Sequence, residues 1–258
     1  WMRVFLANYL FDCKAPLSIN QVHRLGVGDA VVRAYQLVAG GPFDPSDHRQ
    51  ALALRPRVLR GIVGNDADIN FVKTHNAREK AFGVELVPRE LTRSAVYVVR
   101  HPLDVAVSYA RHYGMTPEAA VDALSRKDNT VVGDRHSVPQ YLGRWSTHVE
   151  SWTRQRDFPV TTIRYEDLTA DPHAGFRRVL EHLDFPVEEE RLDRAVRFSS
   201  FDELSAQEAK TGFVEKSPQA EKFFHSGKAG AWREKIEPAR AEAFMNENRR
   251  VMKRHGYI

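Results

Sequence analysis

Short apolar runs closed by polar residues mark the middle of the chain. One run extends from Ile69 to Lys73, and a second, SAVYVVR, covers residues 94–100 and ends at Arg100. A third run begins VTTIRYEDL, over residues 160–168. Because these runs are short and rich in β-branched and aromatic residues, they predict buried β-strands rather than helices.

Segments with helical spacing alternate with these strands. Apolar residues recur near every 3.6 positions in four segments, namely residues 2–11, about 104–113, about 173–183 and about 238–255. Residues 26–59 also have helical spacing, interrupted by the turn-forming sequence AGGPFDPSD. This alternation predicts an α/β fold, in which helices flank a central, mostly parallel β-sheet within a single domain.

The composition is that of a globular protein and narrows its class. The 258 residues are 42% hydrophobic and 28% charged, which is enough to form a core. Cys13 is the single cysteine, so an intramolecular disulfide is excluded, and the sequence contains no CxxC zinc motif. We expect a cytoplasmic protein, and no apolar run reaches the roughly 18 residues that a membrane span needs.

The charge pattern argues against a nucleic-acid-binding protein. Lys and Arg outnumber Asp and Glu by 38 to 34, a net charge of +4. The basic residues are interspersed with acidic ones, as in RQRDFPV, and form no basic arm or stripe. Mixed-charge solvated surfaces explain this pattern better than a nucleic-acid partner does.

Chemically useful residues follow the predicted strands. In doubly wound sheets, ligands bind beyond the carboxyl ends of the strands. Arg100 closes one strand, and Ser108 lies early in the next helix, so together they could bind a phosphate. The alternative is that Arg100 pairs with Asp104 while Ser108 merely packs.

Lys73 and His75 follow another strand. Residues two apart on an extended chain point the same way, so a general base would lie beside a positive charge. Group transfer to a hydroxyl needs this combination, although a lone histidine is more often structural. The sequence contains no HExxH, GxSxG, GxGxxG or Walker A motif, which disfavours a metal site, a serine hydrolase and a dinucleotide-binding fold.

Five motifs, in this order, resemble the cytosolic-type sulfotransferases that use 3′-phosphoadenosine 5′-phosphosulfate (PAPS). They are FVKTH (71–75), VYVVRHPLDVAVSYARH (96–112), RYEDL (164–168), FSSFDEL (198–204) and FFHSGKAGAWR (223–233). The resemblance extends over nearly the whole chain. It implies a P-loop-kinase-like sulfotransferase architecture over residues 1–258, PAPS as co-substrate and no metal.

The resemblance also assigns roles to individual residues. It makes His75 the general base and Lys73 the group that steadies the sulfuryl group during transfer. Arg100 and Ser108 match the pair that binds the 3′-phosphate. The positions that hold the adenosine are matched by Trp1, Tyr165, Ser199 and Phe201.

The sequence departs from the family pattern at two places. The Arg, Lys, Gly triplet that clamps the 3′-phosphate in the family reads His225, Ser226 and Gly227 here, with Lys228 next. The family's phosphosulfate loop precedes a tryptophan that matches Trp1. We therefore expect an N-terminal strand and this loop to lie upstream of residue 1.

The leading hypothesis is a PAPS-dependent sulfotransferase acting on a hydroxyl or amine of a small or lipid-like acceptor. The alternatives are a nucleotide-binding module that has lost transfer, a small-molecule kinase of related fold and, last, a nucleic-acid binder. Either a monomer or a homodimer is compatible with the sequence. Side chains that could line an apolar acceptor pocket, or belong to the core instead, are Phe11, Tyr35, Phe43, Tyr113 and Met115.

Overall fold

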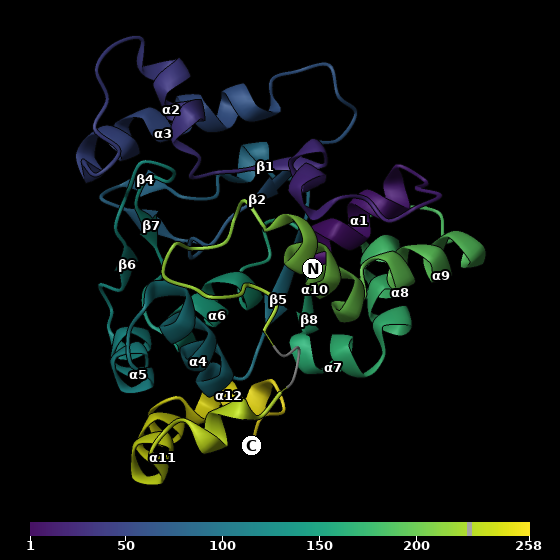
Figure 1. Ribbon diagram of the computed structural model, residues 1–258. Helices are drawn as coiled ribbons and strands as arrows, with labels where there is room; N and C mark the ends of the chain where they lie inside the picture. The colour runs from purple at the N-terminus through teal and green to yellow at the C-terminus, as the bar shows by residue number, and fades with distance from the viewer. Residues whose placement is uncertain (226–228) are drawn as a thin grey trace. The chain divides into compact units, whose positions relative to one another are not determined.

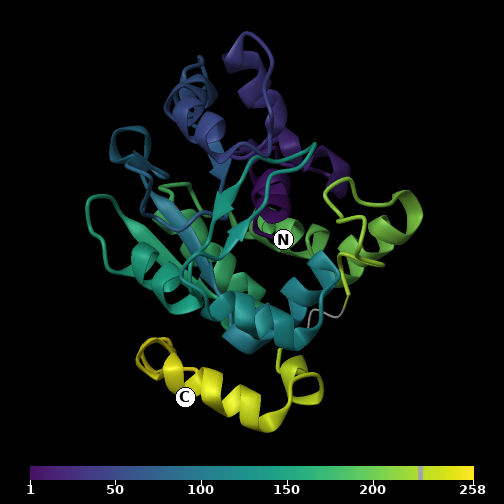
Figure 2. The same cartoon turned by 90° about the vertical axis from the view of Figure 1, so that its left-hand side faces the viewer.

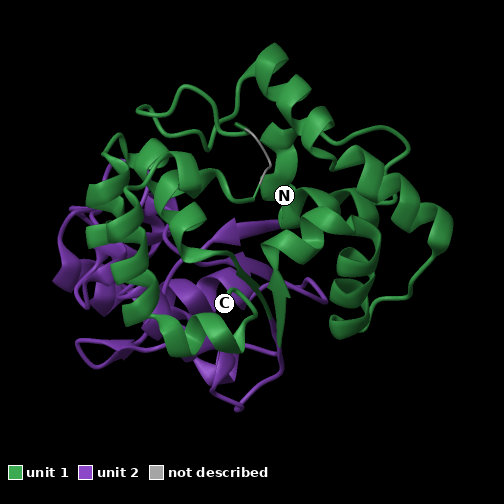
Figure 3. Cartoon of the chain, turned by 90° about the horizontal axis from the view of Figure 1, so that it is seen from below, with its two compact units in different colours: residues 1–25, 96–122, 161–258 green, residues 26–95, 123–160 purple. Residues whose placement is uncertain are grey.

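The computed structural model describes residues 1–225 and 229–258, which form two compact units (Figure 3). Unit 1 contains residues 1–25, 96–122 and 161–258, and unit 2 contains residues 26–95 and 123–160. Each unit is therefore assembled from segments that are separated in the sequence. Within the described residues, no helix has the length and apolar character needed to cross a membrane.

Unit 1 is mainly helical and contains one strand pair, β5 (Ala95–Val99) with β8 (Val160–Arg164). Strand β5 confirms the strand predicted over residues 94–100, and β8 confirms the one predicted to begin at residue 160. The helical segments of this unit are α1 (Met2–Leu10), η1 (Ile19–Arg24), α4 (Pro102–Tyr113), α5 (Pro117–Ser125, which ends in unit 2), α7 (Tyr165–Ala170), α8 (Pro172–His182), α9 (Glu189–Phe198), α10 (Phe201–Thr211), η3 (Ala231–Glu234), α11 (Pro238–Glu247) and α12 (Arg249–Arg254).

Helix α1 confirms the helix predicted for residues 2–11 and packs beside α9 (Figure 1). Its buried ring, Phe5, stacks on Phe176 of α8 with centroids 3.8 Å apart. Tyr9 ties the helix to a distant part of the chain, because its hydroxyl donates to the Pro186 carbonyl at 2.5 Å. The Tyr9 carbonyl in turn accepts from Arg191 Nε at 2.6 Å. Aromatic packing and these polar contacts together fix α1 on α8 and α9.

Helix α4 follows β5 after a two-residue connection, as predicted. It begins at Pro102, two residues earlier than expected, because proline is well suited to the first turn, where no N–H partner is needed. It ends where Gly114 adopts a left-handed conformation with φ of 64°. The helix therefore starts immediately after Arg100 and His101, which places both residues between strand and helix.

The prediction of one continuous C-terminal helix over residues 238–255 is wrong, because the segment forms two helices. The structure divides it at Asn248 into α11 and α12, the yellow helices at the C-terminal end in Figure 2. The Asn248 side chain is buried and donates to the Phe244 carbonyl at 2.8 Å, which also accepts from the Asn248 backbone N–H. Asparagine side chains compete with the helix for backbone partners in this way.

Unit 2 contains the parallel pair β1 (Gly26–Gly28) and β2 (Phe71–Lys73), and β2 confirms the strand predicted over residues 69–73. Strand β1 itself was not predicted, because residues 26–59 have helical spacing. A Cβ atom at Gly26 would lie 2.1 Å from the Phe71 carbonyl oxygen, so glycine permits this close approach. The remaining elements are α2 (Val32–Ala39), α3 (His48–Val63), β3 (Lys80–Ala81), β4 (Val84–Glu85), η2 (Arg89–Leu91), β6 (Thr130–Val131), β7 (Gln140–Tyr141) and α6 (Trp145–Thr153).

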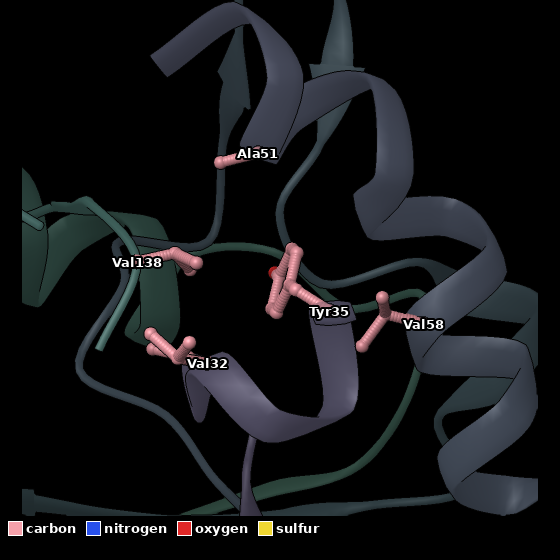
Figure 4. Close-up of a cluster of buried hydrophobic side chains, with 6 residues drawn as sticks. Val32, Tyr35, Ala51, Val58 and Val138 are labelled. Atoms are coloured by element: carbon pink, nitrogen blue, oxygen red, sulfur yellow. The ribbon is translucent and has the colours of Figure 1, made fainter. Parts of the chain in front are cut away.

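Helices α2 and α3 lie side by side and enclose a hydrophobic cluster (Figures 1, 2 and 4). The cluster consists of Ala30, Val32, Tyr35, Ala51, Val58 and Val138. Phe43 packs against it, with its ring stacked on Tyr35 at 5.9 Å. Tyr35 is 1% exposed, so in this structure it belongs to the core rather than to an acceptor pocket.

Candidate functional site

In unit 1, Arg100 and Tyr165 come together where β5 and β8 end. The Arg100 guanidinium carbon lies 4.3 Å from the centre of the Tyr165 ring. Strands β5 and β8 are hydrogen-bonded neighbours, and Arg100 and Tyr165 each directly follow their strand. The cation over an aromatic face fixes the guanidinium, and its planar fork suits phosphate. The structure therefore brings together Arg100 and Tyr165, two residues for which the sequence predicts nucleotide contacts.

Trp1 joins this cluster from the start of α1. Its ring meets the Tyr165 ring edge-on at 6.0 Å and the Phe176 ring edge-on at 5.4 Å. The Trp1 carbonyl accepts the first hydrogen bond of the helix, from the Phe5 N–H at 3.0 Å. Three residues for which sequence reasoning expected nucleotide contacts, Trp1, Arg100 and Tyr165, thus form one continuous cluster.

Ser199 and Phe201 occupy the junction between α9 and α10. Ser199 is fully buried, and its hydroxyl donates to the Ala195 carbonyl at 2.8 Å. Phe201 is half-buried and opens α10, which Ser200 caps by accepting from the Glu203 N–H at 3.3 Å. A ligand cannot contact the Ser199 side chain in this conformation, so its expected role requires a change at this junction.

The remaining predicted donor-site residues are exposed or lie outside the described part. Ser108 is exposed on α4, eight residues beyond Arg100, and His225 is exposed after α10. Ser226, Gly227 and Lys228 lie outside the described residues. The structure therefore leaves Ser108 and His225 open to solvent.

Two buried carboxylates bind the backbone just before and just after residues 225–228. Asp104, in the first turn of α4, accepts from the Gly230 N–H at 2.6 Å and from the Trp232 N–H at 3.2 Å. Glu208 of α10 accepts from the backbone N–H groups of Phe223 at 2.7 Å and Phe224 at 2.9 Å. Hydrogen bonds to a charged acceptor are among the stronger ones in proteins.

Sequence reasoning considered Asp104 only as a partner for Arg100 and did not identify Glu208. The position of Asp104 on the buried face of α4, beside Leu103 and Ala106, was the available signal, because a carboxylate there needs donors. Glu208 carries no such signal, since acidic residues are common on exposed helical surfaces.

His101 supports the same segment from the start of α4. Its ring stacks on Trp232 with centroids 5.2 Å apart, and it meets Tyr257 edge-on at 5.3 Å. The His101 backbone N–H donates to Glu166 Oε1 at 2.8 Å, while the Tyr257 hydroxyl donates to Glu166 Oε2 at 3.1 Å. Burial lowers the pKa of His101 despite the opposing carboxylates of Asp104 and Glu166. The ring is therefore held neutral more readily than a free histidine.

In unit 2, the structure places Lys73 at the end of β2 and His75 just beyond it. Lys73 is half-buried, and its carbonyl accepts from the Asp29 N–H at 2.9 Å. His75 is exposed, and its Nδ1 lies 2.9 Å from Gln140 Oε1. Its carbonyl oxygen is 3.0 Å from Nε2 of His148. An exposed imidazole held by partners on both the ring and the backbone can accept a proton from a bound molecule.

A buried polar network underlies this part of unit 2. Asp29 forms an ion pair with Arg55, and both side chains are almost fully buried. Arg55 also donates to the Leu86 carbonyl at 2.6 Å and to the Tyr35 hydroxyl at 3.2 Å. Asn76, which follows His75, donates to Asp29 Oδ2 at 3.0 Å. The segment after β2 is thereby tied to a buried charge pair that sequence reasoning did not find.

The described residues contain no group of three or more His, Cys, Asp and Glu side chains placed to hold a metal ion. The described side chains supply a cationic and aromatic binding cluster in unit 1. In unit 2 they supply an exposed histidine close in sequence to a lysine.

Comparison with known proteins places this arrangement in a family. The family model of the sulfotransferase domain matches residues 65–256, about three quarters of the chain. Rat sulfotransferase 1 family member D1 is 26% identical over 204 residues, covering 73% of this chain and 64% of the relative. Cytosolic sulfotransferase 12 of Arabidopsis thaliana is 29% identical over 218 residues, covering 78% of this chain and 65% of the relative. This chain thus spans a little less than two thirds of the length of these relatives.

The fold agrees with this assignment. Two crystal structures of retinol dehydratase, one with retinol and PAP and one with androsterone and PAP, match the chain with TM-scores of 0.65 and 0.64. They cover 97% and 95% of this chain and 76% of retinol dehydratase, at 17% identity, which shows the shared fold. The predicted α/β sulfotransferase architecture is confirmed, and the chain belongs to the sulfotransferase domain family.

Proposed function

We propose that this chain carries a PAPS-dependent sulfotransferase activity toward a hydroxyl or amine of a small or lipid-like acceptor. The observation that carries the proposal is the cluster of Arg100, Tyr165 and Trp1 in unit 1. It offers a fixed guanidinium for a phosphate and aromatic surface for a purine base. A 3′-phosphorylated adenine nucleotide carries both a phosphate and a purine base, so it could bind both parts of this cluster.

The residues of unit 2 supply the transfer chemistry in this proposal. His75 takes the proton from the acceptor hydroxyl as its oxygen bonds to sulfur. The bond between sulfur and the phosphate oxygen breaks, and 3′-phosphoadenosine 5′-phosphate (PAP) leaves. Lys73 offsets the negative charge on the moving sulfuryl group. As in phosphoryl transfer, in-line positioning and charge stabilisation supply most of the catalysis.

The departures at the family triplet favour weaker or pH-dependent binding of the donor. His225 and Ser226 replace an arginine and a lysine, so two permanent charges are missing. His225 carries charge only when protonated. A cytoplasmic location is part of the proposal and is supported by the name of the Arabidopsis relative.

The first experiment measures PAP binding by calorimetry for the wild-type chain and for Arg100→Ala. Loss of a charge-assisted pair should weaken binding by about 2 kcal/mol or more. Arg57→Ala is the matched control, because Arg57 is exposed on α3. Adenosine 5′-monophosphate, which lacks the 3′-phosphate, should bind weakly to the wild type and lose little in the Arg100 variant.

Transfer itself is tested with labelled PAPS and a panel of phenols, sterols and amines. His75→Gln should abolish transfer and leave PAP affinity unchanged. PAP binding without transfer to any acceptor would favour a nucleotide-binding module that has lost transfer. If the chain does not bind PAP, the proposal is wrong.

A further inference from the structure

The Gln140 side chain meets the candidate general base directly. It lies at the start of β7 and is 8% exposed, yet its Oε1 reaches His75 Nδ1 at 2.9 Å. Neither the motifs nor the resemblance to known sulfotransferases singles out this residue. A buried amide whose oxygen faces an exposed imidazole raises the question of what it does for the ring.

The backbone around Gln140 is fixed relative to His75 by its neighbour in the strand. The Tyr141 N–H donates to Asn76 Oδ1 at 2.7 Å, and the Tyr141 carbonyl accepts from the Ala77 N–H at 2.8 Å. Tyr141 is thus bonded twice to the segment that immediately follows His75. Because Gln140 precedes Tyr141, its side chain reaches the imidazole from an anchored strand rather than from a free loop.

A second anchor holds the histidine end of this pair. The Asn76 amide nitrogen donates to Asp29, which forms the buried ion pair with Arg55. The indole N–H of Trp152 donates to the Asn76 carbonyl at 3.1 Å. With both sides fixed, the distance between the Gln140 amide and the His75 ring is set by the fold of unit 2.

An amide oxygen only accepts hydrogen bonds, so the His75 nitrogen that faces it must carry the proton. With the proton on Nδ1, the neutral ring keeps its lone pair on Nε2, where a general base needs it. We propose that Gln140 is the positioning residue of the transfer reaction, which holds His75 in the Nδ1–H tautomer with Nε2 as the base. This inference rests on the proposed function of His75.

The charge of the partner matters as well. A glutamine orients the ring without adding a negative charge beside the imidazolium that forms during transfer. Titratable groups near His75 include Lys73, two residues before it, and His148, whose Nε2 meets the His75 carbonyl. Burial lowers the pKa of His148, which favours its neutral form. A carboxylate at position 140 would therefore be the closest new charge.

The experiment compares Gln140→Met, which keeps the side-chain length and removes the acceptor, with Gln140→Glu, which keeps the acceptor and adds charge. Gln36→Met is the matched control, since Gln36 is exposed on α2. The full chain is labelled with ¹⁵N-histidine, and the His75 signals are identified by their loss in His75→Gln. The ring ¹⁵N shifts report which nitrogen carries the proton, independently of activity.

We expect the wild type and Gln36→Met to show the Nδ1–H tautomer, and Gln140→Met to show a mixture with Nε2–H. The kcat of Gln140→Met should fall at least about tenfold with the KM for PAPS unchanged. Gln140→Glu should retain most of kcat. The acidic limb of its pH profile should move about one unit toward higher pH, because the added carboxylate favours the protonated imidazole.

Two results would overturn the inference. One is an unchanged His75 tautomer in Gln140→Met, and the other is a changed tautomer with an unchanged kcat. Absence of sulfuryl transfer by the wild type in the presence of bound PAPS contradicts the proposed function instead. The tautomer measurement then still decides whether Gln140 orients the ring.

Discussion

In unit 1 the candidate binding residues are supported by aromatic rings and by backbone N–H groups bonded to carboxylates. In unit 2 the segment that carries Lys73 and His75 is tied to a buried ion pair, Asp29 with Arg55. Aromatic contacts weaken gradually when one partner is altered. Removing one partner of a buried ion pair leaves the other charge buried and uncompensated. Single substitutions in the ion pair of unit 2 should therefore lower the free energy of unfolding more than substitutions of the aromatic contacts of unit 1 do.

The largest expected loss of stability is that of Asp29→Ala. It leaves the Arg55 guanidinium buried beside the Leu86 carbonyl without its carboxylate, which costs about 3–5 kcal/mol of the free energy of unfolding. Urea unfolding followed by fluorescence measures the loss. Asp68→Ala is the control, because Asp68 is exposed and should change stability by less than about 0.5 kcal/mol.

Replacing the pair as a whole tests the cause. Asp29→Leu combined with Arg55→Met removes both charges and should recover most of the lost stability, since paired buried charges contribute little over apolar side chains. If Asp29→Ala and Asp68→Ala destabilise the chain equally, the ion pair does not hold unit 2 in the way we describe.

We expect an intermediate loss of stability when either of the two buried carboxylates of unit 1, Asp104 or Glu208, is replaced. Asp104→Ala removes the acceptor of two backbone N–H groups and should cost about 2–3 kcal/mol of stability. Hydrogen exchange by mass spectrometry should show faster exchange at Gly230 and Trp232. Glu208→Ala should instead speed exchange at Phe223 and Phe224.

The two variants control for each other. Faster exchange at both pairs of residues in either variant would show general loosening and contradict separate anchoring. An Asp104→Asn variant, which keeps one oxygen acceptor, should lie between the wild type and Asp104→Ala.

The smallest expected effect is a pH dependence through His101. Burial lowers its pKa in the folded chain below the unfolded value of about 6.5, so unfolding takes up a proton as the pH falls below that value. The stability contributed by the neutral ring is fully present above pH of about 6.5 and declines as the pH falls toward the lowered pKa.

The measurement compares the free energy of unfolding at neutral and mildly acidic pH for the wild type and His101→Phe. Phenylalanine preserves the aromatic contact with Trp232 and cannot titrate, so the variant should lose less stability on acidification. Burial also lowers the pKa of His148 and His255, which leaves part of the slope in place. An identical slope in both proteins would exclude a contribution from His101.

The sequence predicted the local parts of this structure well. The strand that ends before Arg100 and the helix that follows it are recognisable from neighbouring residues, because apolar runs and a first-turn proline are local signals. The rule that ligands bind beyond strand ends singled out Arg100, and the family resemblance singled out Tyr165, but neither predicted that the two side chains meet.

The partners that hold these side chains were beyond sequence reasoning. Arg55 lies in an amphipathic helix, where an arginine normally faces solvent, and its partner Asp29 follows a three-residue strand that the sequence did not predict. Gln140 is 65 residues away from His75 and lies in a two-residue strand. Such pairs are created by tertiary packing, and one sequence carries no periodic signal for them.

The attachment of α1 to α8 and α9 has a consequence during synthesis of the chain. The Tyr9 hydroxyl and carbonyl bond to residues 177 and 182 positions later. A ribosome adding about 5–20 residues per second takes about 9–36 s to reach them. For most of that interval Phe5 lacks its stacking partner Phe176 on α8, and we expect chaperones to bind the nascent chain there.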